Sequence, residues 1–423
     1  MIKFVIGKKY KVVDIFFVVM AIISIIILVL PNSTLNNTAF YSVETPSNIV
    51  YKYTSFAISY LIIPVIVFGL VRIPFYKGFQ FWKIIIAVFL IDILIISRVG
   101  GGNIIATGRF EMFFIMLQAW ATCEIALSDR IDVIDGANWF LDIYFLIGFV
   151  TLLYGIANGY NSLEGRAYIQ GLGVGGTGYF AAIYLLHCIY CRKQDMLSWI
   201  RLSLGLFTLI VSGQRTSIFV FIVFLIPFFH DYVIKRKQTS SRKLISTVIY
   251  IFFILIVGTL FISTNSNAGF IARTTDAFKL ILAGKLSSEG SVAGRWGLNF
   301  AGLQILKENP LGLANDYYEL QYRIGQIAFP TFPHSTIISD TLLWSTPVSI
   351  YCCYQLVKIE VILFRNNDSM KWILLFLLVM AVIWGGPELS PAPLVIKILF
   401  ASLAKIEADK YKLSIEEQYV VQA

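Results

Sequence analysis

The sequence predicts an all-α polytopic membrane protein with about 12 transmembrane helices and one large external loop. Of its 423 residues, 57% are hydrophobic and 14% are charged, and long apolar runs recur from end to end. A soluble protein carries roughly 25% charged residues. So little charge does not cover the water-facing surface of a chain this long, so lipid must be part of its solvent.

A helix needs about 20 predominantly apolar residues to cross a bilayer. Runs of roughly that length predict spans at 12–30, 55–71, 81–97, 110–127, 137–157, 171–190, 196–212, 216–234, 244–263, 336–357, 371–384 and 392–404. The first run is expected to be an uncleaved helix, because Pro31-Asn32-Ser33 offers no small-residue cleavage site.

Basic residues cluster in every second connection between the predicted spans. They are Lys8, Lys9 and Lys11, then Arg72 and Lys77, Arg192 and Lys193, the segment 235–243, and Arg365 and Lys371. The positive-inside rule then places both termini in the cytoplasm of a multi-pass inner or plasma membrane protein. This rule also explains the net charge of +9, so no nucleic acid is expected as a partner.

The whole chain, 1–423, reads as a single membrane domain that contains a large external (periplasmic) loop at 264–335. The loop has a helical pattern at 294–308 and turn signals at Asn309-Pro310 and Gly312. Aromatic residues throughout it favour an ordered structure. A separate G-x-G-x-x-G pattern at 173–178 opens a predicted span without a preceding strand. It therefore indicates close helix packing rather than a dinucleotide site.

The predicted external face is rich in arginine, although the positive-inside rule should deplete it there. The arginines are Arg98, Arg109, Arg166, Arg215, Arg273, Arg295 and Arg323. A guanidinium grips phosphate oxygens through paired hydrogen bonds and keeps its charge, so this excess indicates an anionic ligand. The alternative is ordinary solvation of the loops. Arg215 is the sharpest candidate, because it lies in a turn of a few residues between two spans.

Further candidates come from titratable residues near the same face. His334 is the one histidine expected outside, and a histidine exchanges protons near neutral pH. His187 and His230 are expected at the cytoplasmic interface. Carboxylates within predicted spans are Asp92, Asp142 and Asp340, and such residues are functional candidates by default. Asp340 is a possible second proton acceptor or an arginine partner. No residue spacing indicates a metal site, and no cofactor is expected.

Together these features resemble the O-antigen ligase and polymerase superfamily of bacterial envelopes. The resemblance rests on three segments between about residue 166 and the C-terminus: "SGQRTSIF", "GRWGLNFAGLQILKENPLGL" and "FPHSTIISDTLLW". Where the family often has Gly-x-Gly, this chain has Gly312-Leu313-Ala314, and where it often has His-Asn, His334 is followed by Ser335.

The resemblance implies a metal-independent inverting glycosyltransferase of the polytopic C type in the bacterial inner membrane. It implies a donor glycan on undecaprenyl diphosphate at the periplasmic face, and a lipid-linked repeat unit as acceptor. Arg215 and Arg295 would stabilise the diphosphate leaving group, and His334 would accept the proton of the attacking hydroxyl. The other external arginines and Asp340 would bind substrate. A chain-length regulator and a flippase are possible partners.

Two alternatives stay open at this point. A ligase of the same superfamily would use lipid A-core as acceptor. A flippase or secondary transporter would place its binding groups near the bilayer midplane, where Asp92 is the one deep candidate.

Overall fold

The computed structural model describes residues 133–157, 162–163, 166–169, 173–192, 196–235, 290–313, 317–328, 333–344, 346–383, 400–401 and 403–411. The spans expected at 12–30, 55–71, 81–97, 110–127 and 244–263, and most of 392–404, lie outside these residues. So do Asp92 and the first part of the long loop, 264–289.

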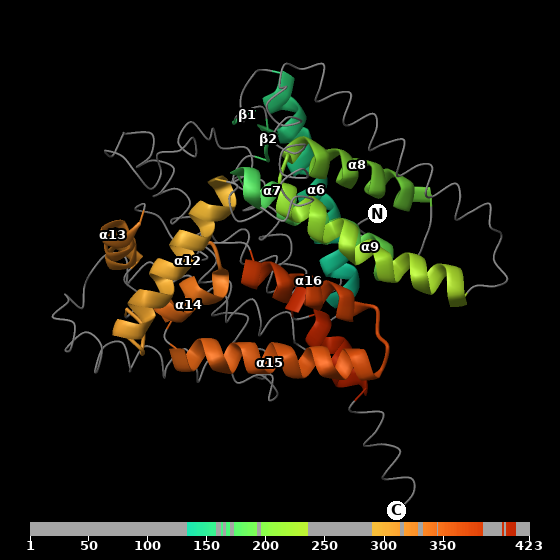
Figure 1. Cartoon of the computed structure of the whole chain (residues 1–423). Coiled ribbons are helices and arrows are strands. Elements are labelled where there is room, and N and C mark those ends of the chain that lie inside the picture. Colours follow the sequence, from blue (N-terminus) through green and yellow to red (C-terminus); the bar gives the residue numbers. More distant parts are fainter. Residues whose placement is uncertain are drawn as a thin grey trace, which may run out of the picture.

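The described part is almost entirely helical, as the fold class predicts (Figure 1). In chain order its elements are α6 (Val133–Ala157), β1 (Ser162–Leu163), β2 (Arg166–Ala167), α7 (Gly173–Tyr190), α8 (Met196–Ser212), α9 (Arg215–Lys235), α12 (Gly290–Glu308), α13 (Tyr317–Ile327), α14 (Thr336–Trp344), α15 (Thr346–Arg365) and α16 (Met370–Ile383). Residues 400–401 and 403–411 are also helical. The two-residue strands form an antiparallel hairpin that the sequence analysis did not predict.

Most predicted spans in this part coincide with one helix each, and 336–357 is the exception. That stretch is divided between α14 and α15, and α15 continues to Arg365. Pro347 explains the division, because proline fits the first turn of a helix and disrupts its interior. The Thr346 hydroxyl also donates a hydrogen bond to the Pro310 carbonyl (2.5 Å), which ties the start of α15 to the turn after α12.

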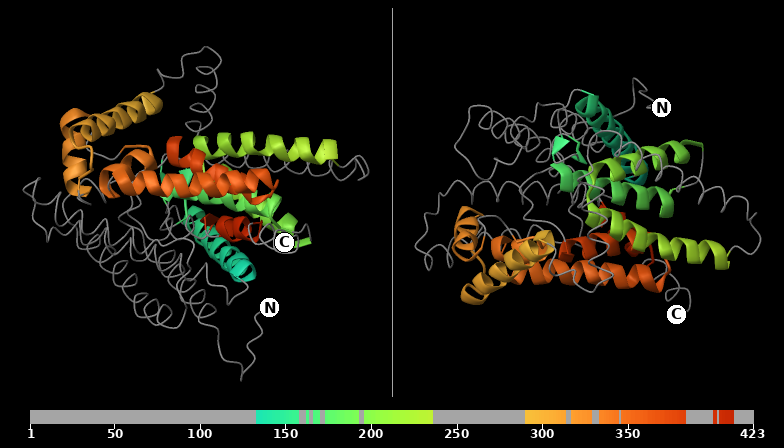
Figure 2. Two further views of the ribbon diagram at one scale, coloured as in Figure 1. Left: turned by 90° about the horizontal axis from the view of Figure 1, so that it is seen from below. Right: turned by 45° about the horizontal axis from the view of Figure 1, so that its top comes forward.

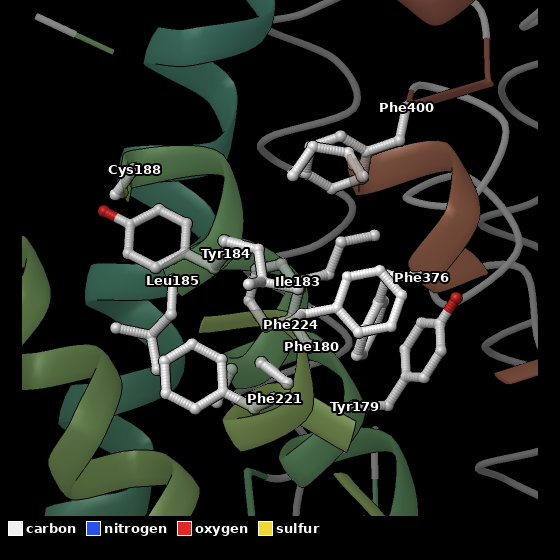
Figure 3. Packing of buried hydrophobic residues seen from close by; sticks show 14 of the residues in the cluster. Tyr179, Phe180, Ile183, Tyr184, Leu185, Cys188, Phe221, Phe224, Phe376 and Phe400 are labelled. Carbon is white, nitrogen blue, oxygen red and sulfur yellow. The ribbon is translucent and has the colours of Figure 1, made fainter. Parts of the chain in front are cut away.

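Helix α7 is the centre of the hydrophobic core. Every residue from Tyr179 to Cys188 is buried, so this helix is enclosed on all sides by others. Tyr184 stacks on Phe145 of α6 with ring centroids 4.2 Å apart, and Tyr179 lies near Phe376 of α16. Figure 3 shows Tyr179 and Tyr184 of α7 in this core together with Phe224 of α9 and Phe376 of α16. Among the helices of the described residues, none has the length together with the apolar composition that crossing a membrane requires.

Helices α12, α13 and α14 pack together beside this core (Figure 2). The predicted helix at 294–308 is confirmed as α12, and the predicted turn after it closes when the Gly312 N–H donates to the Asn309 carbonyl (2.9 Å). Gly312 has a positive φ of 99°, a conformation that glycine adopts without strain. The Leu313 N–H then donates to the Leu342 carbonyl of α14 (2.6 Å). The end of α12 is thereby fixed to α14.

Candidate functional site

Arg215 is the first residue of α9, directly after a tight turn from α8. Gly213 has φ 58° and donates its N–H to the Ile210 carbonyl (3.0 Å), which ends α8. Gln214 follows, buried, with its N–H on the Ser212 hydroxyl (3.3 Å). The short turn expected from the sequence is therefore present. It holds the half-buried Arg215 at a helix N-terminus, where the backbone carries positive partial charge.

This turn is held against the start of α7. A Cβ on Gly178 would contact the Cβ of Gln214, and it would lie 2.9 Å from the Ser212 hydroxyl. Only glycine allows so close an approach. The interpretation of segment 173–178 as a helix-packing segment is confirmed at Gly178.

Arg295 on α12 contacts the first turn of α9. Its Nη1 donates a hydrogen bond to the hydroxyl of Thr216 (3.1 Å), across 79 residues of sequence. Thr216 is the neighbour of Arg215 in the first turn of α9. The helix of the long loop thus folds back onto the turn between α8 and α9, which places the two arginines at one end of α9.

His334 completes this arrangement from a third segment. It is half-buried in the short connection that precedes α14. Its neighbour Pro333 packs against α12, where a Cβ on Gly302 would lie 2.8 Å from the proline ring. Burial, and then the nearby charge of Arg295, lower the pKa of His334 to about 4. The imidazole is therefore neutral near pH 7 and able to accept a proton. Arg215, Thr216, Arg295 and His334 are called the outer cluster below.

The remaining predicted site residues are placed as follows. Arg166 is on β2, opposite Leu163, and Arg323 is half-buried on α13. Asp340 is half-buried on α14, six residues after His334. Arg98, Arg109 and Arg273 lie outside the described residues. The structure thus brings Arg295 to the first turn of α9, beside Arg215, and places His334 within the influence of the Arg295 charge.

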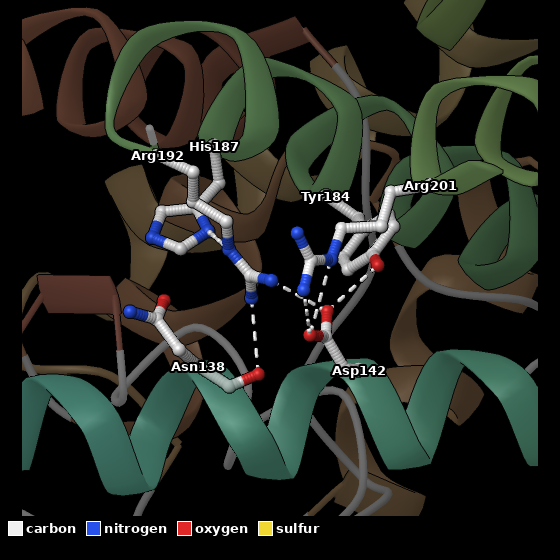
Figure 4. A network of polar contacts seen from close by, with 6 residues as sticks. All are labelled: Asn138, Asp142, Tyr184, His187, Arg192 and Arg201. Atoms are coloured by element: carbon white, nitrogen blue, oxygen red, sulfur yellow. Dashed lines mark hydrogen bonds and ion pairs between the residues drawn. The ribbon is translucent and has the colours of Figure 1, made fainter. Parts of the chain in front are cut away.

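A second polar network lies at the opposite end of α7 and α8 (Figure 4). Asp142 of α6 pairs with two arginines, Arg192 at Nη1 (2.6 Å) and Arg201 at Nη2 (3.1 Å). The Tyr184 hydroxyl also donates to Asp142 (2.8 Å). The Arg192 side chain is 7% exposed and that of Asp142 is 29% exposed. Through Asp142, Tyr184 and Arg201, this partly buried network joins α6, α7 and α8.

The sequence predicted Asp142 as a carboxylate within a span and Arg192 as a basic residue of a connection, without a contact between them. Successive connections are expected on alternating faces of the membrane, and this alternation places Asp142 and Arg192 near the same face. It therefore indicated that the two residues could meet. His187, which was expected at the cytoplasmic interface, is a buried residue in the last turn of α7. His187 is 3% exposed, accepts a hydrogen bond from Arg192 Nε (3.3 Å), and packs edge-on to Phe400.

Comparison with known proteins does not assign the chain to a family. No family model matches it, and no curated protein matches it significantly.

Proposed function

We propose that this chain is a polymerase of O-antigen or a related surface polysaccharide, a polytopic glycosyltransferase of the bacterial inner membrane. It would transfer glycan from undecaprenyl diphosphate to a lipid-linked repeat unit at the periplasmic face. The sequence resemblance to the superfamily of O-antigen ligases and polymerases motivates this proposal, and the outer cluster supplies its chemistry.

Exposed apolar faces support the membrane part of the proposal. On α9, Phe219, Ile222 and Ile226 are each at least half exposed and follow helical spacing along one face. A similar line runs along α15 through Ile350, Tyr354 and Val357. Leaving such a surface in water costs about 25 cal/mol per Å², and contact with lipid removes that cost.

The hydrogen bond between Arg295 and Thr216 is the observation that carries the enzymatic part. It brings a guanidinium from the long loop to the turn that holds Arg215. Two fixed positive groups at a helix N-terminus form a site for an anion of high charge. A diphosphate is such an anion, and its charge grows further when its bond to the sugar breaks.

The proposed reaction is a single displacement at the anomeric carbon of the donor sugar. A hydroxyl oxygen of the acceptor attacks this carbon, and the bond from the carbon to the diphosphate oxygen breaks. The bonding electrons leave with undecaprenyl diphosphate, beside Arg215 and Arg295. Neutral His334 takes the proton of the attacking hydroxyl. Attack opposite the leaving group inverts the anomeric configuration.

Lysine substitutions test this assignment. A point ammonium does not match two phosphate oxygens as a guanidinium does. Arg215→Lys and Arg295→Lys should therefore lose most activity although net charge is kept. Arg365→Lys, at the exposed end of α15, is the matched control and should keep it.

The measurement is chain length on a gel, from purified protein and a lipid-linked repeat donor. If the arginines merely attach the loop to the membrane surface, lysine should replace both without loss. Full-length polymer from Arg215→Lys and Arg295→Lys would therefore exclude the diphosphate role.

A further inference from the structure

Helix α12 has apolar residues on two opposite faces. On one face Leu298, Ala301 and Ile305 are at most 7% exposed, and α12 packs against α13 and α14. On the other face Trp296, Phe300 and Leu303 are 69%, 66% and 50% exposed. Their spacing of four and then three residues places them in one line along the helix.

The composition of the exposed face is that of a helix at a membrane interface. Tryptophan is enriched where the lipid headgroups meet the acyl chains. The apolar line ends in exposed polar residues, Gln304 and Lys307. A long basic side chain beside an apolar face reaches toward lipid phosphates while its stem stays in contact with the hydrocarbon. Arg295, next to Trp296, adds a second cation at the other end of the line.

The position of α12 agrees with its composition. Arg295 bonds to Thr216, and the exposed apolar line of α9 begins at Phe219, within one turn of Thr216. In the left view of Figure 2, α12 and α9 both lie along the upper side of the molecule. The exposed line of α12 thus starts where that of α9 starts.

We propose that α12 lies in the interface of the outer leaflet, with Trp296, Phe300 and Leu303 in contact with phospholipid. The inference rests on the membrane location in the proposed function and adds a lipid-binding surface to it. Contact with lipid fixes how deeply Arg295 lies in the membrane interface. Its guanidinium is then held at the level of the lipid phosphates, which is also the level of the donor's diphosphate.

Photocrosslinking in native membranes tests this surface. The photoreactive residue p-benzoylphenylalanine replaces Phe300 in the full chain, and mass spectrometry identifies what it captures. Gln326, exposed on α13, is the matched control in the same loop. Phe219 on α9 reports the membrane location itself. The same reagent at Trp296 gives a second reading if the Phe300 variant does not accumulate.

The expected result is a mass increase of one phospholipid at Phe300 and at Phe219, and none at Gln326. Capture of a second copy of the chain, or of another protein, at Phe300 would overturn the inference. So would a lipid adduct at Phe219 with none at Phe300, and the proposed membrane location would then stand. Absence of lipid at both positions would overturn the inference and the membrane location together.

Discussion

Neutral His334 beside a permanently charged Arg295 is the arrangement on which the proposed chemistry depends at the residue scale. A general base must be unprotonated at the working pH, and the buried site next to a cation keeps this imidazole so. In the proposed reaction the same cation would face the leaving group. Burial and the charge of Arg295 together keep the imidazole unprotonated, and the charge of Arg295 would also stabilise the departing diphosphate.

Removing the imidazole should stop polymerisation without removing the protein. General acid–base groups contribute about 10²- to 10⁴-fold to rate, so His334→Ala should lower activity by that order. The measurement is glycan chain length, with immunoblotting of the membrane fraction as the control for protein amount. Near-normal chains from His334→Ala would exclude His334, and Asp340 would become the next candidate base.

The pH dependence follows from the lowered pKa of His334, about 4 against an ordinary 6.5. The free enzyme loses its base only as pH falls through the lower value. kcat/KM should therefore be flat from pH 7 to pH 5.5 and decrease below that. Arg295→Gln removes one of the two causes and should raise the pKa of His334, whereas Lys358→Gln on α15 should not. NMR titration of the imidazole measures this without relying on the activity of the variant. If kcat/KM of the unmodified enzyme instead fell with a midpoint at pH 6.5, this result would contradict the position of His334 in a buried site next to Arg295.

At the scale of elements, close packing of α7 on the turn before α9 positions Arg215. Gly178→Ala would force its new methyl group into Gln214 and Ser212. Such overpacking costs about 1–3 kcal/mol and displaces the turn, so both thermal stability and activity should fall.

Gly297→Ala in α12 is the matched control, because nothing lies within 4 Å of its Cβ position. Alanine there should stabilise the helix by about 0.5–1 kcal/mol. Thermal unfolding in detergent distinguishes the two variants. Equal stability of both would contradict the close approach at Gly178.

We expect the ion network around Asp142 to stabilise the fold rather than to take part in the reaction. Asp142→Asn leaves Arg192 and Arg201 without their carboxylate, and because this network is partly buried the loss should exceed the roughly 1 kcal/mol of an exposed pair. The amount of folded protein should fall, whereas the rate per folded molecule should hold. Glu407→Gln removes the partner of the exposed Lys410 and should change stability by less than about 1 kcal/mol. A changed rate with unchanged stability in Asp142→Asn would assign Asp142 to the reaction.

Local pattern predicts the elements better than the contacts between them. Apolar runs located α6 to α9 and α16, and the polar turn located Arg215. The division between α14 and α15 could have been predicted from the sequence, because Pro347 disfavours one continuous helix over 336–357. The contact between Arg295 and Thr216 spans 79 residues, and no local pattern encodes it. The same holds for Asp142 of α6, Arg201 of α8 and Arg192, which follows the end of α7.

At the scale of the whole molecule, the proposed function requires the helical body around α7 to meet the segment that carries α12 to α14. The body supplies Arg215 at the start of α9, and the segment supplies Arg295 and His334. Both parts must meet for an anionic leaving group to be held while a hydroxyl is deprotonated. A transporter needs no such meeting at the outer surface, because its binding groups belong near the bilayer midplane.

The glycan profile of a deletion strain is the most direct test of the proposed polymerase function. We expect surface glycan to stop at one repeat unit and the wild-type gene to restore long chains. Loss of every repeat from lipid A-core would instead identify the ligase. Normal glycan together with altered solute uptake would contradict the account and identify a transporter.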